Sequence, residues 1–318
     1  MCRHLLAVAL LLALAAPAPA GVIAGYDPAS QASHDTYDRF ASGFPTAPVP
    51  NSSSAFVAAG IDLSGVGWLA GDPKFAVTLI SPRHILGANH VGFPGGQVQF
   101  VNAAGQVKTY TVMSTTRLTT PGQTQPSDLL LGTLSAAIPA ADGIRYIGVA
   151  GVTAAQAVGL PMLAYGQNPA YAPSPHLGTN VINGVSLESF NNPSDPDQTR
   201  VMTYDWAAGV PGEMYLIGGD SGGPAFVRAD GDLALAGVHY GVSRSTNDPQ
   251  PGDFSASTFV PEYITGLNAA MAGSGFQVTV VPVPEPAGLL AFAALAVTAG
   301  VVRRVSRRRP RSGCPAPR

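Results

Sequence analysis

One serine of this chain lies in a run of glycines immediately before an apolar segment. Residues 217–226 read IGGDSGGPAF, which places glycines on both sides of Ser221. Glycine loses much conformational entropy on folding and packs little surface, so such a run needs another reason. Glycine also lets backbone amides approach a ligand, which makes the N–H groups of Gly219 and Ser221 candidates for an oxyanion-binding pair beside a nucleophilic hydroxyl. A tight turn is the alternative, because the same residue types form turns.

A serine nucleophile needs a base and an acidic group that orients the base. Of the five histidines after residue 20, His90 is the best candidate, because it ends the strand-like segment VTLISPRHILGANH in small residues that leave room for an imidazole. Asp128 opens the apolar run DLLLGTL, the setting expected of a buried carboxylate. A core histidine and a turn aspartate are the alternatives. His34 and His176 are expected to be exposed in irregular segments.

His90, Asp128 and Ser221 follow one another in the order of the chymotrypsin- and trypsin-like serine proteases. The string GDSGGP matches that family's nucleophile segment, and LGANH is similar to its base segment, with Asn89 where the family has alanine. The resemblance covers residues 55–272. It implies an all-β fold of two six-stranded antiparallel β-barrels, and peptide hydrolysis through an acyl-enzyme, with Gly219 and Ser221 forming the oxyanion hole. This chemistry requires no cofactor and no metal.

The same resemblance points to residues of a substrate pocket. Tyr215 stands six residues before the serine, where trypsins have aspartate, so a preference for Lys or Arg substrates has no charge partner there. The segment VHYG resembles the family's Ser-Trp-Gly segment, with His239 in place of the serine and Tyr240 and Gly241 in place of Trp-Gly. A histidine there is similar to the glutamyl endopeptidases, which implies a preference for acidic side chains. A structural histidine is the alternative.

Asp220 has a further role in the resembled family, where the aspartate before the nucleophile pairs with a newly exposed N-terminal amine. The segment GVIAGYD from Gly21 is similar to the mature start of those proteases. Cleavage after Ala20 would free an amine there.

Short apolar runs between glycine and proline punctuation predict many strands from residue 55 to about residue 260. A helix is predicted over residues 261–271, where apolar residues fall on one face. Residues 21–54 lack a steady hydrophobic period and are expected to be an irregular leader or pro-segment. Residues 273–280 are expected to be a linker.

Both ends of the chain carry targeting features. Residues 1–20 have a basic start, a 12-residue apolar stretch and the small-residue end Ala-Pro-Ala, which predicts a signal peptide; the apolar stretch is short for the alternative, a spanning helix. Residues 281–311 contain Pro-Glu-Pro, an apolar helix over 287–302 and a cluster of arginines, an order that resembles the PEP-CTERM sorting signal of bacterial exported proteins. That resemblance implies transient membrane insertion and processing by an exosortase-type enzyme. A permanent tail anchor is the alternative.

Composition limits the partners. Residues 21–280 hold nine Lys and Arg against 18 Asp and Glu, a net charge of −9, which argues against nucleic acid. The two cysteines, at positions 2 and 314, both lie outside this range, so the exported part has no disulfide. The aspartates of NNPSDPDQTR, residues 191–200, are expected to lie in a solvated loop, with calcium binding as the alternative.

These observations favour an exported bacterial serine endopeptidase that acts on proteins or peptides and works at the cell surface, in the envelope or in the medium. Two alternatives remain open at this point. One is a surface or matrix binding protein with an inactive protease fold, which Asn89 and the long leader favour. The other is an esterase with the same three residues, since acyl-transfer chemistry does not dictate the acyl substrate.

Overall fold

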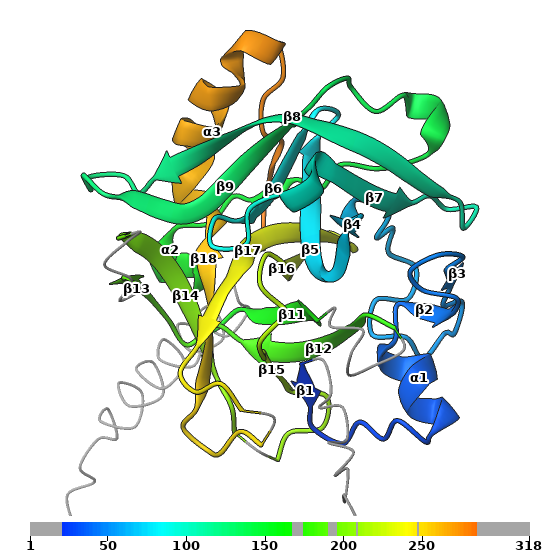
Figure 1. The fold of residues 1–318 in the computed structure, drawn as a ribbon. Coiled ribbons are helices and arrows are strands. Elements are labelled where there is room, and N and C mark those ends of the chain that lie inside the picture. Colours follow the sequence, from blue (N-terminus) through cyan, green and yellow to red (C-terminus); the bar gives the residue numbers. More distant parts are fainter. Residues whose placement is uncertain (1–20, 167–173, 190–195, 208, 247, 285–318) are drawn as a thin grey trace, which may run out of the picture.

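The fold is mostly β and consists of two halves stacked on each other (Figure 1). The computed structural model describes residues 21–166, 174–189, 196–207, 209–246 and 248–284. A closed barrel occupies the upper half of Figure 1 and a larger sheet the lower half, and the chain passes from the first to the second after residue 134. The expectation of a β fold is confirmed.

The first half is a closed barrel of six antiparallel strands in the order β4-β5-β6-β9-β8-β7. The strands are β4 (Val66–Leu69), β5 (Asp72–Ser81), β6 (His84–Ala88), β7 (Gln97–Val101), β8 (Val107–Thr119) and β9 (Pro126–Leu134). Alternate apolar residues fill its interior, among them Leu79, Ile85 and Phe100, all fully buried. Closure leaves this barrel no free strand edge.

The second half is a nine-stranded sheet whose main path is β12-β11-β16-β17-β18-β14-β13. These strands are β11 (Pro161–Gly166), β12 (His176–Val181), β13 (Gly184–Glu188), β14 (Thr199–Asp205), β16 (Pro224–Ala229), β17 (Asp232–Val242) and β18 (Phe254–Phe259). Off this path, β10 (Val149–Ala150) pairs in parallel with β17 and with β19 (Val280–Val281). The helix α2 (Ala154–Ala157) precedes β11.

The sequence predicted a second six-stranded barrel, and in the described residues the ladders of the second half form a path with two ends, β12 and β13. Only Ile182 and Asn183 separate β12 from β13, yet these strands take the two ends of the path. The backbone N–H of Ile182 donates to Leu160 and that of Asn183 donates to Thr203, so each residue continues the ladder of a different edge. Among the described residues no ladder joins β12 to β13, but the chain itself runs from one to the other and so links the two ends of the path.

Apolar side chains from both halves form one continuous core between them. Leu86 and Leu129 of the barrel belong to the same buried cluster as Tyr165 and Phe226 of the sheet. Each such side chain contributes roughly 1.5–3 kcal/mol when fully buried. This shared core fixes the barrel on the sheet, and with it any site that draws residues from both.

The predicted helix at residues 261–271 is confirmed. It consists of a short 3-10 turn (Val260–Tyr263) followed by α3 (Ile264–Met271). Tyr263, Leu267 and Met271 are buried in the core between the two halves. The helix lies against the barrel beside β8 and β9 in Figure 1, although it follows β18 of the sheet. It therefore ties the end of the second half to the first.

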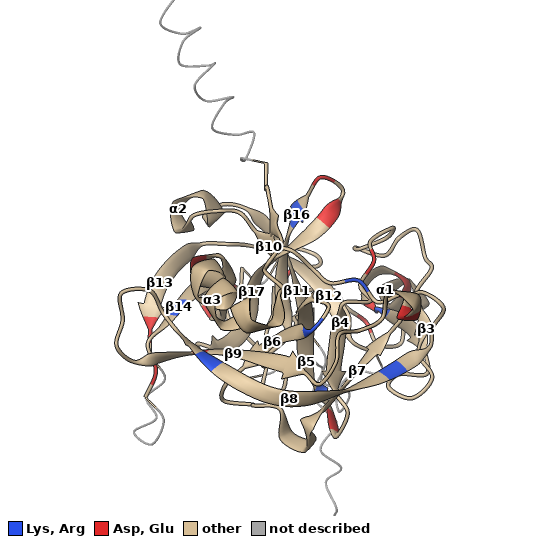
Figure 2. Cartoon of the chain, turned by 90° about the horizontal axis from the view of Figure 1, so that it is seen from above, with Lys and Arg blue, Asp and Glu red and all other residues tan. Residues whose placement is uncertain are grey.

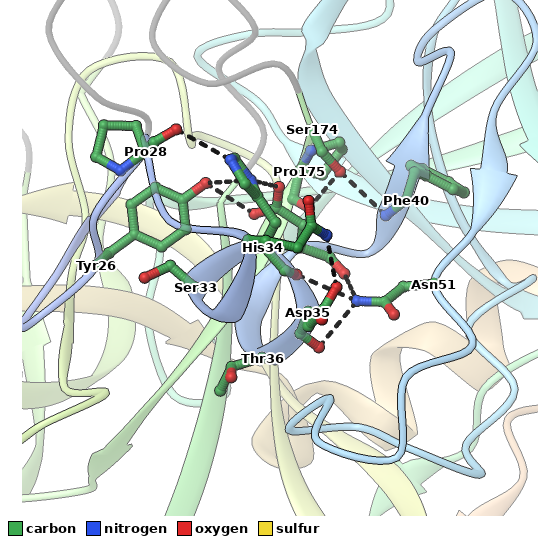
Figure 3. A network of polar contacts seen from close by, with 12 residues as sticks. Tyr26, Pro28, Ser33, His34, Asp35, Thr36, Phe40, Asn51, Ser174 and Pro175 are labelled. Atoms are coloured by element: carbon green, nitrogen blue, oxygen red, sulfur yellow. Dashed lines mark hydrogen bonds and ion pairs between the residues drawn. The ribbon is translucent and has the colours of Figure 1, made fainter.

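Residues 21–54 are more regular than expected. They form β1 (Val22–Ile23), which pairs with β15 (Met214–Tyr215), the helix α1 (Gln31–Tyr37), and the strand pair β2 (Phe40–Ser42) and β3 (Val49–Pro50). Figure 3 shows the polar contacts of this segment: the Asn51 side chain donates to the backbone oxygens of His34 and Asp35 at the end of α1, and the Phe40 amide donates to Ser174.

A buried arginine anchors this segment to the body. Arg39 is 5% exposed, and its guanidinium donates to the Tyr165 hydroxyl at 2.9 Å and to the Leu63 carbonyl oxygen at 2.7 Å. Burying a guanidinium is favourable only when its N–H groups find partners, so these contacts specify where the segment packs. Residues 21–54 lack a hydrophobic period, which suggested an irregular leader. The structure shows the reason: polar contacts such as those of Arg39 hold this segment on the body.

Residues 273–280 also pack on the body and are not a free linker. Val278 is 5% exposed, and its amide donates to Asn268 of α3. The strand β19 then begins at Val280. In the described part of the chain no helix has the length and apolar character needed to cross a membrane. The predicted signal peptide 1–20 and apolar helix 287–302 lie outside the described residues.

Candidate active site

The register of two barrel strands brings His90 next to Asp128. In the antiparallel pair of β6 and β9, Ala88 lies opposite Leu129. The residues just after Ala88 and just before Leu129 therefore leave the barrel at the same end. The Asn89 amide extends the pairing by donating to the Asp128 carbonyl oxygen at 2.6 Å.

His90 makes two hydrogen bonds to the Asp128 carboxylate. Its Nδ1 lies 2.7 Å from Oδ2, and its backbone N–H donates to Oδ1 at 2.8 Å. A carboxylate only accepts, so this contact assigns the proton to Nδ1 and leaves Nε2 as the basic nitrogen. An imidazole held in this tautomer is oriented to take a proton from a neighbouring hydroxyl.

Asp128 is 2% exposed. Burial raises the pKa of its carboxyl above the ordinary value, while the hydrogen bonds from His90 lower it. The contacts with His90 therefore stabilise the charged form of a carboxylate that burial alone would favour as the neutral acid.

The glycines around Ser221 allow the loop between β15 and β16 to pack closely on both halves. Gly222 has φ of +83°, and a Cβ there would lie 2.8 Å from the Ala76 carbonyl oxygen of the barrel. A Cβ on Gly223 would lie 2.9 Å from the Tyr165 carbonyl oxygen of the sheet. Glycine is required at both positions, because backbone atoms cannot move aside as a flexible side chain can.

Ser221 and His90 line the same cavity, of about 270 Å³, between the barrel and the sheet. Its other lining residues include Tyr240 and Gly241 of β17. Within the described part of the chain, the amides of Gly219 and Ser221 donate to no other protein group, whereas the neighbouring Asp220 amide donates to Ile217. Two uncommitted N–H groups beside a serine hydroxyl are able to receive an oxyanion.

Asp220 lies beneath this loop and close to Gly21. Its side chain is 1% exposed, and Oδ2 accepts a hydrogen bond from the Ile217 amide at 2.8 Å. A Cβ on Gly21 would lie 3.5 Å from the same oxygen. Gly21 is buried, and its carbonyl oxygen accepts from His176 Nε2 at 3.2 Å. The residue after the predicted cleavage point and the predicted partner of its amine are therefore brought together.

The structure corrects the expectation for two other histidines. His176 is 1% exposed instead of solvent-exposed, because β12 buries it beside Gly21. His34 is half-buried on α1 and pairs with Asp38 at 2.7 Å. The Asp38 hydrogen bond and charge raise the pKa of His34 against the effect of its partial burial.

Tyr215 is not part of the cavity wall. It is 1% exposed, its ring packs on Trp206 with the centroids 6.2 Å apart, and its hydroxyl donates to the Arg244 carbonyl oxygen at 2.6 Å. The cavity is lined instead by the apolar residues Leu216, Ile217 and Val242, together with polar residues that include Asp220, His239 and Ser245. The apolar part of the lining therefore comes from neighbours of Tyr215 and from β17, and not from Tyr215 itself.

His239 is among the residues that line the cavity, but both of its ring nitrogens are bonded inside the sheet, so the geometry favours the structural alternative over a receptor for acidic side chains. Its Nε2–H donates to the Tyr165 carbonyl oxygen at 2.9 Å, so Nδ1 accepts from the Ser257 hydroxyl at 2.9 Å. Burial lowers the pKa of His239 to about 3, so the ring is neutral at physiological pH. A neutral imidazole whose only N–H is already used has nothing to offer a carboxylate.

A β-barrel joined to a second β-sheet, with a His–Asp pair and a glycine-flanked serine on one cavity, is the arrangement of a serine protease. The trypsin family model matches residues 76–261, more than half of the chain. The chain therefore belongs to the trypsin family of serine proteases. No curated protein gives a significant match.

Sequence reasoning missed two buried residues behind Asp128. Asp197 was expected to lie in a solvated loop but is 3% exposed, and Thr199, the first residue of β14, is fully buried. A run of Asn, Pro, Ser and Asp carries no signal for such burial. The one available sign was the apolar strand that starts directly after it.

Proposed function

We propose that the chain is an exported serine endopeptidase in which Ser221 is the nucleophile, His90 the general base and Asp128 the residue that orients the base. The main support is the 2.7 Å contact between His90 Nδ1 and Asp128 Oδ2, beside a cavity that His90 shares with Ser221, in a member of the trypsin family. The free amides of Gly219 and Ser221 form the oxyanion hole.

In this mechanism Ser221 Oγ attacks the carbonyl carbon of the substrate peptide bond while its proton passes to His90 Nε2. The oxyanion of the tetrahedral intermediate accepts hydrogen bonds from the two amides. His90 then protonates the leaving amine, and the C–N bond breaks to leave an ester on Ser221. Water, deprotonated by His90, attacks that ester, releases the acid product and restores the serine hydroxyl.

A fluorophosphonate probe tests this proposal, because it reacts only with an activated serine. The purified wild-type protein should be labelled, and Ser221→Ala should abolish labelling while its far-UV circular dichroism stays unchanged. Ser54→Ala, at an exposed serine of the N-terminal segment, is the control and should be labelled like the wild type. Equal labelling of wild type and Ser221→Ala, or no labelling of the wild type, would count against the assignment.

The cavity supports a preference for an apolar side chain just before the cleaved bond. Leu216, Ile217 and Val242 line it, while the Asp220 carboxylate bonds to the Ile217 amide and the His239 ring is fully bonded. Charged side chains would lose hydration there without gaining a partner. Lys and Arg, coloured blue in Figure 2, are sparse along the ribbon, and residues 21–280 carry a net charge of −9, which favours peptide over nucleic acid as the substrate.

Profiling with a peptide library should therefore enrich Leu, Val, Met or Phe at this position, and enrichment of Glu, Asp, Lys or Arg would contradict the proposal. The same preparation should hydrolyse casein. Activity on a short p-nitrophenyl ester without any on casein or on the peptides would identify an esterase instead.

The proposal of export is based on the two terminal segments of the sequence. It has three steps: cleavage after Ala20, transient membrane insertion of residues 287–302 and exosortase-type processing near Pro286. Delivery to the cell surface, the envelope or the medium follows from it. Mass spectrometry of the mature protein from the native host should find Gly21 as the first residue and a C-terminus near Pro286. A mature chain that keeps either segment would overturn the corresponding step.

Cleavage after Ala20 would also complete the site. It would release the Gly21 amine in a buried position next to the Asp220 carboxylate. A buried carboxylate gains most from a charged partner that cannot be replaced by water. Asp220 precedes Ser221 directly, so this ion pair would hold the loop whose amides bind the oxyanion.

A further inference from the structure

A chain of hydrogen bonds connects the backbone of Asp128 to a second buried carboxylate. The Asp128 amide donates to Thr199 Oγ1 at 2.8 Å, and the Thr199 hydroxyl donates to Asp197 Oδ2 at 2.7 Å. A threonine hydroxyl has one proton, and a carboxylate only accepts, so the direction of both bonds is determined. All three residues are at most 3% exposed.

This chain crosses from one half of the molecule to the other. Asp128 belongs to β9 of the barrel, and Thr199 begins β14 of the sheet. A backbone bond from the Gln198 amide to the Pro126 carbonyl oxygen, 3.0 Å long, runs alongside. The starts of β9 and β14 are therefore joined by two neighbouring hydrogen bonds, one at Pro126 and one at Asp128.

The second carboxylate is unfavourable by itself. Burying a charge costs free energy, and the charge of Asp197 adds to the effects that raise the pKa of Asp128. A buried acceptor with a full charge, however, makes the hydrogen bond from Thr199 stronger than a neutral one. Tyr240, which lines the substrate cavity, donates a longer bond of 3.5 Å to Asp197 Oδ1.

The side chain of Asp128 has little other support. Among the described residues, both hydrogen bonds to its carboxylate come from His90 itself. His239, the residue of β17 before Tyr240, directs its ring to Tyr165 and Ser257. The direction of the carboxylate is thus determined by its own backbone, which is held by Asn89 at the carbonyl oxygen and by Thr199 at the amide.

We propose that Thr199 and Asp197 are positioning residues of the active site, which hold the Asp128 backbone so that its two carboxylate oxygens meet Nδ1 and the amide of His90. They also fix the barrel residues His90 and Asp128 relative to the sheet. This inference rests on the proposed function, because it concerns the residue that orients the base. Neither residue touches substrate.

Two substitutions at Thr199 distinguish the effect of its hydroxyl group on activity from the effect of its packing. Thr199→Val keeps the shape and removes the hydrogen bonds, while Thr199→Ser keeps the hydroxyl. With the active sites counted by burst titration, Thr199→Val should lower kcat about tenfold or more and change KM less than about twofold. Thr199→Ser should stay within about twofold of the wild type. Titration removes the contribution of misfolded molecules, so a merely structural role would leave kcat per active site unchanged.

A double-mutant cycle tests whether the two residues act as one unit. Asp197→Asn keeps an acceptor oxygen and removes the charge, so it should lower kcat less than Thr199→Val does. The double variant should lose no more than Thr199→Val alone, because the charge acts through the hydroxyl. If the loss in kcat of the double variant equals the product of the two single losses, the two residues act independently and the proposed hydrogen-bond chain is overturned. An unchanged kcat in Thr199→Val, measured beside an active wild type, would overturn it too. A wild type that is neither labelled nor active would overturn the proposed function, and this inference with it.

Discussion

At the scale of single residues, burial decides what His239 can do. Its type and its place before Tyr240 favoured substrate recognition, but both ring nitrogens are bonded inside the sheet. Its pKa of about 3 lies below the ordinary value of 6.5, because burial disfavours the charged ring. The folded protein therefore binds a proton at His239 less readily than the unfolded chain does.

The sign of the resulting pH dependence follows from linkage. Above pH 6.5 the ring is neutral in both states and has no effect. Between pH 6.5 and about 3 only the unfolded chain is protonated there, so the free energy of unfolding falls as pH falls, by up to about 1.4 kcal/mol per pH unit. His239→Gln should show a shallower loss across this window in urea unfolding at pH 7, 5.5 and 4.

His34 provides a control of opposite sign for that prediction. Its pKa is raised by Asp38, so its contribution to stability is present at pH below the ordinary histidine value and is lost as pH rises through the raised one. His34→Gln should therefore make the loss of stability on acidification steeper. Equal pH slopes for the wild type and His239→Gln would show that His239 is protonated in the folded state.

At the scale of elements, the loop from Ile217 to Pro224 depends on glycine for its distance from the barrel. Gly222 combines a positive φ with a Cβ position only 2.8 Å from a backbone oxygen of β5. Gly218, in the same loop, has open space around its Cβ position. A side chain at Gly222 would thus collide with the barrel, whereas a Cβ at Gly218 would meet no neighbour.

Gly222→Ala should lower the free energy of unfolding by about 2 kcal/mol or more, through backbone strain and the forced shift of the loop. It should also lower kcat about tenfold or more, because Ser221 moves with the loop. Gly218→Ala is the matched control for stability and should leave the urea midpoint within error of the wild type. An unchanged midpoint for Gly222→Ala would mean that the loop lies further from the barrel.

At the scale of the whole molecule, the N-terminal segment lies along the sheet, and its first residue, Gly21, is next to the loop from Ile217 to Pro224. Gly21 lies beside Asp220, β1 pairs with β15, and Arg39 is anchored on Tyr165. Gly21, where the proposed mature chain would start, is therefore held by contacts with both the sheet and Asp220, the residue before the proposed nucleophile. Under the proposed cleavage after Ala20, we expect the activity to depend on what precedes Gly21.

A protein that begins at Gly21 should react with a fluorophosphonate at least about tenfold faster than one with two extra residues before Gly21. The extension removes the amine charge from the Asp220 carboxylate. The same two residues added after residue 284 serve as the control and should have no effect. Asp220→Asn should slow the protein that begins at Gly21 in the same way, and equal rates for all forms would contradict the ion pair.

The sequence predicted those features that depend on short stretches of residues, such as a motif or an alternation of apolar and polar residues. The trypsin family, the barrel strands and the helix at 261–271 could all be predicted, because glycine runs, alternating apolar residues and a helical face are local patterns. The strand path of the second half depends on which edges meet, which no short segment encodes. The burial of Asp197 and the fixed ring of His239 depend on partners far along the chain.

The pairing of β19 with β10 has a consequence for release from a membrane. Val281 is the last residue of this pair and lies a few positions before Pro286, the predicted cut. Cleavage there would leave every ladder bond of the body in place. Detachment would then change where the enzyme works without changing its stability, so a cell could retain or shed a fully assembled catalyst by controlling the processing step alone.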